Sequence, residues 1–247
     1  MKVIFNADDF GLSKGVNLGI IEACKNGVVR SATMMAGMAG FDHAAILAKE
    51  NPELKIGVHL TLTAGKSVGG VYQTITDEKG NFLNLSTLTG KVNEIDLNEV
   101  EREYEAQIQK ILTAGIEIDH FDSHHHTHNL DGIVNVYIKL AKKYNKKVRF
   151  FDKEFLSEEY DGTVTTDNFT ESFYNENVSI DSLMEIISEQ KGTSLEVMCH
   201  PAYVDYPLYQ SSSYHVKRVF ELNVLTSDEL RDFLERNDIQ VCSFSDL

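Results

Sequence analysis

Short β-prone runs alternate with helical patterns along the whole chain, and this alternation constrains the fold more than any other feature of the sequence. The first β-prone run covers residues 2–7 and is followed by a helical pattern over residues 14–26. The pattern repeats about seven times, with no internal repeat and no linker-like stretch. Because βα units of this kind build a parallel sheet covered by helices, we predict an α/β fold whose sheet is either wound open or closed into a barrel.

The remaining elements follow from periodicity and from helix start and stop signals. We expect further strands at residues 30–36, 55–63, 116–124, 147–151, 194–200 and 239–243. We expect further helices at residues 41–50, 96–114, 131–144, 181–190 and 227–237. Residues 96–99 resemble a capping box at the start of their helix. Residues 64–90 carry five glycines and are predicted to form a long functional loop or lid, and residues 152–178 are expected to be irregular.

Composition sets the class of protein and excludes some partners. Acidic residues number 38 against 23 basic ones, giving a formal net charge of −15, so we expect no nucleic-acid partner. Hydrophobic residues make up 42% of the chain, which is enough for a core, and 247 residues suit one α/β barrel. The three cysteines are scattered, which is typical of a reducing compartment. We find no secretory leader and no apolar run of about 18 residues, so we expect a cytoplasmic protein without a membrane partner.

Polar side chains follow four of the predicted strands at the points where they end. The four segments are Asn6-Ala7-Asp8-Asp9, Gly57-Val58-His59, Asp122 to His128, and Cys199-His200-Pro201. In a parallel βα fold the carboxyl ends of the strands form the functional edge. We therefore expect these four segments to converge on one site, although they are far apart in sequence.

The histidine-rich segment is the strongest local signal, because five of the nine histidines lie within residues 120–128. If the strand continued that far, alternation would put His120, Asp122, His124, His126 and His128 on one face and His125 on the other. Neighbours on that face are about 6.6–6.8 Å apart, so only one or two can bind the same metal ion and the rest would contact substrate. Asp122 is placed to orient an imidazole ring. A solvated polar loop is the alternative interpretation.

The other polar ends suggest acid–base chemistry beside a metal. Strict alternation points Asp8 and Asp9 to opposite faces, so both enter one site only if the strand ends or bulges there. One carboxylate would then balance the metal's charge while the other accepts a proton; capping the following turn is the alternative. His200 suits a general acid, or else a structural role. His59 alone is weak evidence, and Arg149 either reaches the same edge or is an ordinary strand residue.

These motifs resemble the YdjC-like carbohydrate deacetylase family, and within it are most similar to the chitooligosaccharide deacetylases. The resemblance covers essentially the whole chain and is carried by Asn6-Ala7-Asp8-Asp9-Phe10-Gly11, Gly57-Val58-His59, Asp122-Ser123-His124-His125-His126-Thr127-His128 and Glu196-Val197-Met198-Cys199-His200-Pro201. It implies a single-domain distorted (β/α) barrel over residues 1–247. Relatives often place a proline soon after the His-x-His run, where this chain has Asn129-Leu130-Asp131-Gly132, so the chain departs from the family pattern at the start of the following helix.

The resemblance also implies an activity and its residues. The protein would remove an acetyl group from N-acetylglucosamine units of short chitooligosaccharides, such as chitobiose or its 6-phosphate. One divalent ion, magnesium by resemblance, would be held by Asp9, His59 and His124. Asp8 would match the catalytic base and His200 the histidine that assists the leaving group.

Ligand chemistry leaves the metal open, because two histidines and a carboxylate suit Zn²⁺ or another transition metal better than Mg²⁺. His126, His128, Arg149 and the loop at residues 64–90 would hold sugar hydroxyls. A binuclear hydrolase acting on phosphoesters or cyclic amides is a second interpretation, and a non-catalytic metal carrier or sensor is a third. The expected partner is a small acetylated amino-sugar oligosaccharide. The oligomeric state stays open, with a homodimer as one alternative.

Overall fold

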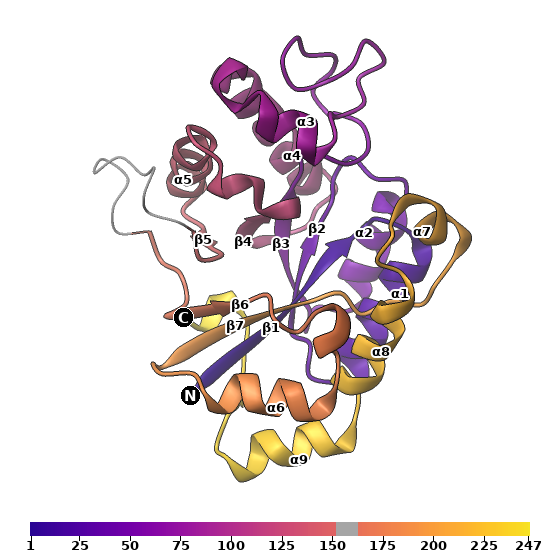
Figure 1. Ribbon diagram of the computed structural model, residues 1–247, viewed down its shortest axis with the longest axis vertical. Coiled ribbons are helices and arrows are strands. Elements are labelled where there is room, and N and C mark those ends of the chain that lie inside the picture. The colour runs from indigo at the N-terminus through magenta and orange to yellow at the C-terminus, as the bar shows by residue number, and fades with distance from the viewer. Residues whose placement is uncertain (152–162) are drawn as a thin grey trace.

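The computed structural model describes residues 1–151 and 163–247 and shows one parallel sheet surrounded by helices (Figure 1). The sheet order is β5-β4-β3-β2-β1-β7-β6, with β8 beside the start of β1, and every recorded pair is parallel. The strands are β1 (Lys2–Phe10), β2 (Ser31–Met34), β3 (Lys55–Leu60), β4 (Ile118–Ser123), β5 (Lys147–Val148), β6 (Asn168–Thr170), β7 (Ser194–Cys199) and β8 (Gln240–Val241). The predicted α/β class with about seven parallel strands is confirmed.

Helices cover the outer face of the sheet, as the βα alternation requires (Figure 1). They are α1 (Lys14–Lys25), α2 (Phe41–Glu50), α3 (Leu85–Gly90), α4 (Leu97–Thr113), α5 (Ile133–Tyr144), α6 (Ile180–Ser188), α7 (Tyr206–Ser211), α8 (Val216–Leu225) and α9 (Asp228–Arg236). Within the described ranges, no helix combines the length and the apolar character needed to cross a bilayer.

The sheet is curled and open. Its path begins at β5 and ends at β6, and no ladder joins these two strands in the part of the chain that the structure describes. Residues 3–10 of β1 are all buried, as expected for a central strand covered on both faces. Most buried apolar side chains belong to one large cluster, and Ile4, Cys242 and Phe244 form a second, smaller one; together they support the polar strand ends.

Several elements differ from the sequence-based expectation. The region expected to be irregular contains β6, while its portion at residues 152–162 lies outside the described residues. Helices α7 and α8 lie between β7 and α9 and were not expected. The predicted helix at residues 41–50 matches α2, and α5 begins at Ile133 after Gly132, whose φ of 72° favours glycine.

The end of β1 bulges, and this places two adjacent carboxylates in the same region. The pairing register with β2 shifts between Ala7 and Phe10, and Asp9 has a φ of 70°. A bulge interrupts the alternation of side chains that a regular strand would impose. The condition under which Asp8 and Asp9 can both serve one site is therefore met.

The long loop between β3 and α4 is fixed to the body of the protein. Glu103 of α4 accepts hydrogen bonds from the backbone N–H groups of Val68 and Gly69, at 2.9 and 2.8 Å. Glu99 accepts from those of Gln73 and Thr74, at 3.0 and 2.8 Å. Carboxylate-to-amide bonds are among the stronger hydrogen bonds in proteins, so this loop is an anchored wall in the structure.

The anchoring also explains an unexpected detail at the start of α4. Asp96 caps the helix, but its side chain accepts a hydrogen bond from the Asn98 backbone N–H at 2.8 Å and not from the Glu99 N–H that a capping box would use. Glu99, which would complete the box by bonding back to the Asp96 N–H, binds the loop instead. The Asp96 N–H donates to the Thr74 hydroxyl at 3.1 Å.

Candidate active site

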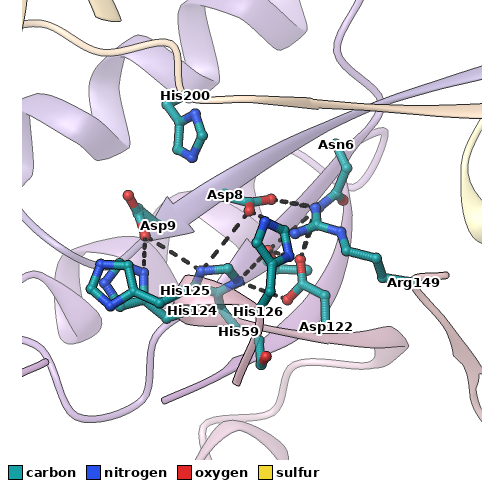
Figure 2. A network of polar contacts seen from close by, with 12 residues as sticks. Asn6, Asp8, Asp9, His59, Asp122, His124, His125, His126, Arg149 and His200 are labelled. Atoms are coloured by element: carbon teal, nitrogen blue, oxygen red, sulfur yellow. Dashed lines mark hydrogen bonds and ion pairs between the residues drawn. The ribbon is translucent and has the colours of Figure 1, made fainter. Parts of the chain in front are cut away.

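A cavity of about 690 Å³ lies at the carboxyl ends of the strands, where the four polar segments meet. Six of the predicted site residues line it: Asp8, Asp9, His59, His124, His126 and His200. Figure 2 shows these side chains directed toward one another from separate strands and loops. The structure thus brings together segments that the sequence separates by up to 192 positions, from Asp8 to His200.

Three of these side chains form a donor set suited to a divalent cation. Asp9 Oδ1 lies 3.1 Å from His124 Nδ1 and 3.5 Å from His59 Nε2. The ligand atoms of Asp9, His59 and His124 all lie within 4.8 Å of one another. Asp9 Oδ1 is buried and has no hydrogen-bond partner among the described residues. A buried carboxylate oxygen whose near neighbours are two imidazole nitrogens fits a metal ion, and the mixed N/O donors favour a transition metal.

The second oxygen of Asp9 is held by a residue that sequence reasoning missed. Arg218 Nη2 donates to Asp9 Oδ2 at 2.7 Å, and both side chains are buried. Burial alone would raise the pKa of Asp9, but Arg218 and His124 outweigh it and hold that pKa well below its usual value. Asp9 therefore stays ionised and presents only one oxygen to the donor set.

His59 is oriented through its other ring nitrogen, which lies 2.7 Å from Asp122 Oδ1. The second oxygen of Asp122 accepts from the Thr33 hydroxyl at 2.9 Å and lies 3.0 Å from Arg149 Nη2. A carboxylate behind an imidazole fixes the tautomer and directs Nε2 forward. Burial alone would lower the pKa of His59, but Asp122, Asp8 and Asp9 together raise it to about 9.

Asp8 lies next to the donor set, with Oδ2 4.0 Å from His59 Nε2. Arg149 grips it with two hydrogen bonds, Nη1 to Oδ2 at 2.8 Å and Nη2 to Oδ1 at 2.6 Å. Asn6 Nδ2 also donates to Asp8 Oδ1 at 3.0 Å. This bidentate clamp fixes the carboxylate in one orientation beside the cavity.

The structure does not bring Arg149 and His128 to the cavity, where they were expected to hold sugar hydroxyls. Arg149 is fully buried behind Asp8 and also donates from Nε to Glu196 Oε1 at 2.8 Å. His128 is fully buried, bonds to the Ser123 hydroxyl at 2.7 Å and stacks on Tyr137. Burial lowers the pKa of His128 to about 3, so it is neutral. Both side chains are placed to support the site from behind.

The histidine segment departs from strand alternation because β4 ends at Ser123. His124–Asn129 forms a 3₁₀ turn in which His125 and His126 have φ values of 54° and 51°. His125, expected to point away, lines the cavity and bonds to the Thr63 hydroxyl at 2.9 Å. His120 lies deep in the protein, stacked on Phe244 with a centroid distance of 3.8 Å. A left-handed turn of two residues was not visible in the local pattern.

His200 faces the donor set from the opposite side of the cavity, beyond the end of β7 (Figure 2). The buried Glu221 accepts hydrogen bonds from the His200 backbone N–H and the Tyr214 hydroxyl, and its Oε1 lies 3.7 Å from His200 Nδ1. Tyr174 and Tyr214 stack at 3.9 Å and present their edges to His200. Arg218 and Glu221, three residues apart on α8, therefore reach both halves of the site.

The fold and the site together define the class of protein. It is an α/β protein with a curled parallel sheet, and a buried Asp–His–His donor set at the carboxyl ends of the strands forms a candidate metal centre. The chain belongs to the YdjC-like protein family, whose sequence model matches residues 2–236. It is 45% identical over 250 residues to a protein of Listeria monocytogenes named carbohydrate deacetylase, with all of both chains covered. It is 40% identical over 249 residues to a protein of the same name from Clostridium beijerinckii, again over both full lengths.

Solved structures share the fold. A crystal structure from Enterococcus faecalis, of a protein whose suggested role is cellobiose-phosphate cleavage, superposes with a TM-score of 0.90 at 32% identity. That match covers 99% of this chain and 98% of the other. A family 4 carbohydrate esterase from Streptomyces lividans superposes with a TM-score of 0.53 at 13% identity, covering 97% of this chain and 91% of the other. This second likeness concerns the fold alone, and it confirms the distorted barrel.

Proposed function

We propose that this protein is a metal-dependent deacetylase that removes the N-acetyl group from N-acetylglucosamine units of short chitooligosaccharides, releasing acetate. One observation carries the proposal: the Asp9–His59–His124 donor set shares a single cavity with Asp8 and His200. Amide hydrolysis needs a base for the attacking water, an electrophile for the carbonyl and an acid for the departing amine. The name carbohydrate deacetylase, carried by full-length relatives 40–45% identical, supports the same reaction.

Asp9 Oδ1, His59 Nε2 and His124 Nδ1 are the atoms that would hold the ion. A divalent ion there supplies Lewis-acid chemistry: it lowers the pKa of water and stabilises negative charge on the acetyl oxygen. The resemblance points to Mg²⁺, whereas the two nitrogen donors favour Zn²⁺, Co²⁺ or Fe²⁺. Arg218 occupies the second oxygen of Asp9 and so limits this carboxylate to one ligand atom.

Asp8 is the proposed general base. Arg149 and Asn6 both donate to its Oδ1, whereas its Oδ2 accepts from Arg149 Nη1 and keeps a lone pair with which to accept the proton of the attacking water. His200 is the proposed general acid: Nδ1 faces Glu221, which leaves Nε2 to donate a proton to the amine nitrogen. His126 is the proposed contact to a sugar hydroxyl, because it lines the cavity and is partly exposed.

The binuclear interpretation is less well supported by the geometry. A second group, Asp8–His59–Asp122, has suitable ligand atoms, but it shares His59 with the first. Arg149 also bonds to Asp8 and lies 3.0 Å from Asp122, so a cation already fills this position. We expect one metal ion per chain by elemental analysis, and two ions would favour the binuclear hydrolase.

Acetate release from di-N-acetylchitobiose and its 6-phosphate, with and without a chelator, tests the proposal directly. Asp8→Asn should keep the metal but lose about 10²–10⁴-fold in turnover, the usual contribution of a general base. His124→Ala should lose both metal and turnover. Near-normal acetate release by Asp8→Asn would contradict the assigned roles. An inert protein that binds and exchanges metal freely would favour the carrier or sensor.

A further inference from the structure

A second cavity, of about 950 Å³, lies next to the active-site cavity and shares two of its lining residues. The shared residues are His126 and Glu171, whose Nε2 and Oε2 atoms lie 3.0 Å apart. Beyond this pair the second cavity is lined by Asn129, Phe150, Phe169 and Ser172. The two cavities are therefore adjacent, and the His126–Glu171 ion pair lines both of them.

The His126–Glu171 ion pair is a weak barrier between the two cavities. The side chain of His126 is 28% exposed and that of Glu171 is 63% exposed. Partly exposed pairs contribute little to stability, because water screens them and both side chains lose freedom. A ligand that crosses the pair can replace its hydrogen bond at little cost, since a hydroxyl can both donate to Glu171 and accept from His126.

Aromatic rings give the second cavity its chemical character. Phe150 is 42% exposed, which leaves a large apolar ring in contact with water. Phe169 is held in place by the Arg149 guanidinium, 5.1 Å from its ring centroid, and by the edge of His126 at 5.7 Å. An apolar surface bordered by amide, hydroxyl and carboxylate groups suits a ligand with an apolar ring face and a polar rim. A pyranose has this form.

We infer that the substrate groove continues across the His126–Glu171 pair, and that Phe150 and Phe169 bind the sugar unit next to the one that is deacetylated. This inference depends on the proposed function, since it assigns the neighbouring unit of the same oligosaccharide to the second cavity. It makes the protein selective for oligosaccharides over the free N-acetylated monosaccharide. The selectivity arises at a position away from the reacting atoms.

The test compares N-acetylglucosamine with di-N-acetylchitobiose in the metal-loaded enzyme. Phe150→Ala should lower the ratio of kcat/KM for the disaccharide to that for the monosaccharide about tenfold, which corresponds to about 1.4 kcal/mol. The loss should appear mainly in KM, because binding away from the reacting atoms is equal in ground and transition states. Phe220→Ala removes an exposed phenylalanine, 54% accessible on α8, and serves as the matched control. An equal effect of Phe150→Ala on both substrates would overturn the inference.

A binding measurement separates this inference from the proposed function. Calorimetric titration of di-N-acetylchitobiose into Asp8→Asn protein, with and without Phe150→Ala, does not require turnover. Weaker binding of the disaccharide to the double variant supports the groove even if no acetate is released. Identical affinity in the two proteins refutes it even if the enzyme is an active deacetylase.

Discussion

Removing the Arg149 guanidinium should destabilise the protein strongly, because three buried carboxylates depend on it. Arg149 bonds to Asp8 and Glu196 and lies 3.0 Å from Asp122. Arg149→Met keeps much of the side-chain volume but leaves these carboxylates without their cation. Removing one partner of a buried ion pair typically costs about 3–5 kcal/mol. In a chain of this size each kcal/mol shifts Tm by about 2–4 °C, so a fall of roughly 6–20 °C is expected.

The pH dependence of this loss has a definite sign. In the wild type, the pKa of Asp122 is lowered despite its burial, because His59 and Arg149 stabilise the charged carboxylate. The ionised carboxylate therefore stabilises the folded state at pH values above the pKa of Asp122 in the unfolded chain, and this stabilisation is lost as pH falls. Burial raises the pKa of Glu196 to about 7 even with Arg149 beside it. Without Arg149 the folded-state pKa values rise, so the variant binds protons on folding. The difference in Tm should therefore shrink as pH falls from 8 to 5.

Thermal unfolding followed by circular dichroism at pH 8, 7, 6 and 5 measures both effects. Arg149→Lys is the matched control: it keeps the charge but loses the two-pronged grip on Asp8, so its Tm should fall less. Activity should fall in both variants, since neither fixes Asp8 in one orientation. A decrease in Tm below about 2 °C for Arg149→Met, or a difference that grows toward pH 5, would refute this reasoning.

Two further measurements probe the metal site and its support. Asp122, Asp8 and Asp9 raise the pKa of His59 to about 9 despite its burial, so a metal ion must displace a proton from this ring. Zn²⁺ affinity measured by calorimetry should therefore fall up to about tenfold per pH unit between pH 8 and 6. An affinity that does not depend on pH would contradict this. Gly57→Ala would place a Cβ 2.6–2.8 Å from the His120 ring, which is held by its stacking on Phe244. We expect the free energy of unfolding, measured with urea, to fall by about 1–3 kcal/mol. An unchanged unfolding midpoint would show that this packing relaxes freely.

The sequence predicted much of the fold because hydrophobic alternation is local. Strand ends at Asp8, His59, Asp122 and His200 could be placed on one edge, since parallel βα units leave no other arrangement. The bulge at Asp9 could be stated only as a condition, because it depends on the register with β2. The alternation rule failed after Ser123 for the same kind of reason: two left-handed residues redirect the chain, and nothing in a run of histidines signals them.

The residues that sequence reasoning missed act over long distances along the chain. Arg218 reaches Asp9 across 209 positions, and Glu221 reaches His200 from one turn further along α8. The available signal was weak: one basic and one acidic residue three positions apart, on the buried face of a short helix. Arg149 shows the reverse case, since its position near the edge was foreseen but its burial behind Asp8 was not. Side-chain direction depended on the surrounding carboxylates, which no local pattern encodes.

The wall formed by the loop between β3 and α4 has a consequence for divergence within this fold. Glu99 and Glu103 hold that loop through its main-chain amides, which every residue except proline provides. The side chains of Ala64 and Leu85, which face the cavity, can therefore be exchanged without releasing the loop from these main-chain anchors. The entrance to the cavity can therefore change its side chains while the site residues at the strand ends keep their positions. Glu99 and Glu103 of α4 make this possible, because they hold the loop whatever side chains it carries.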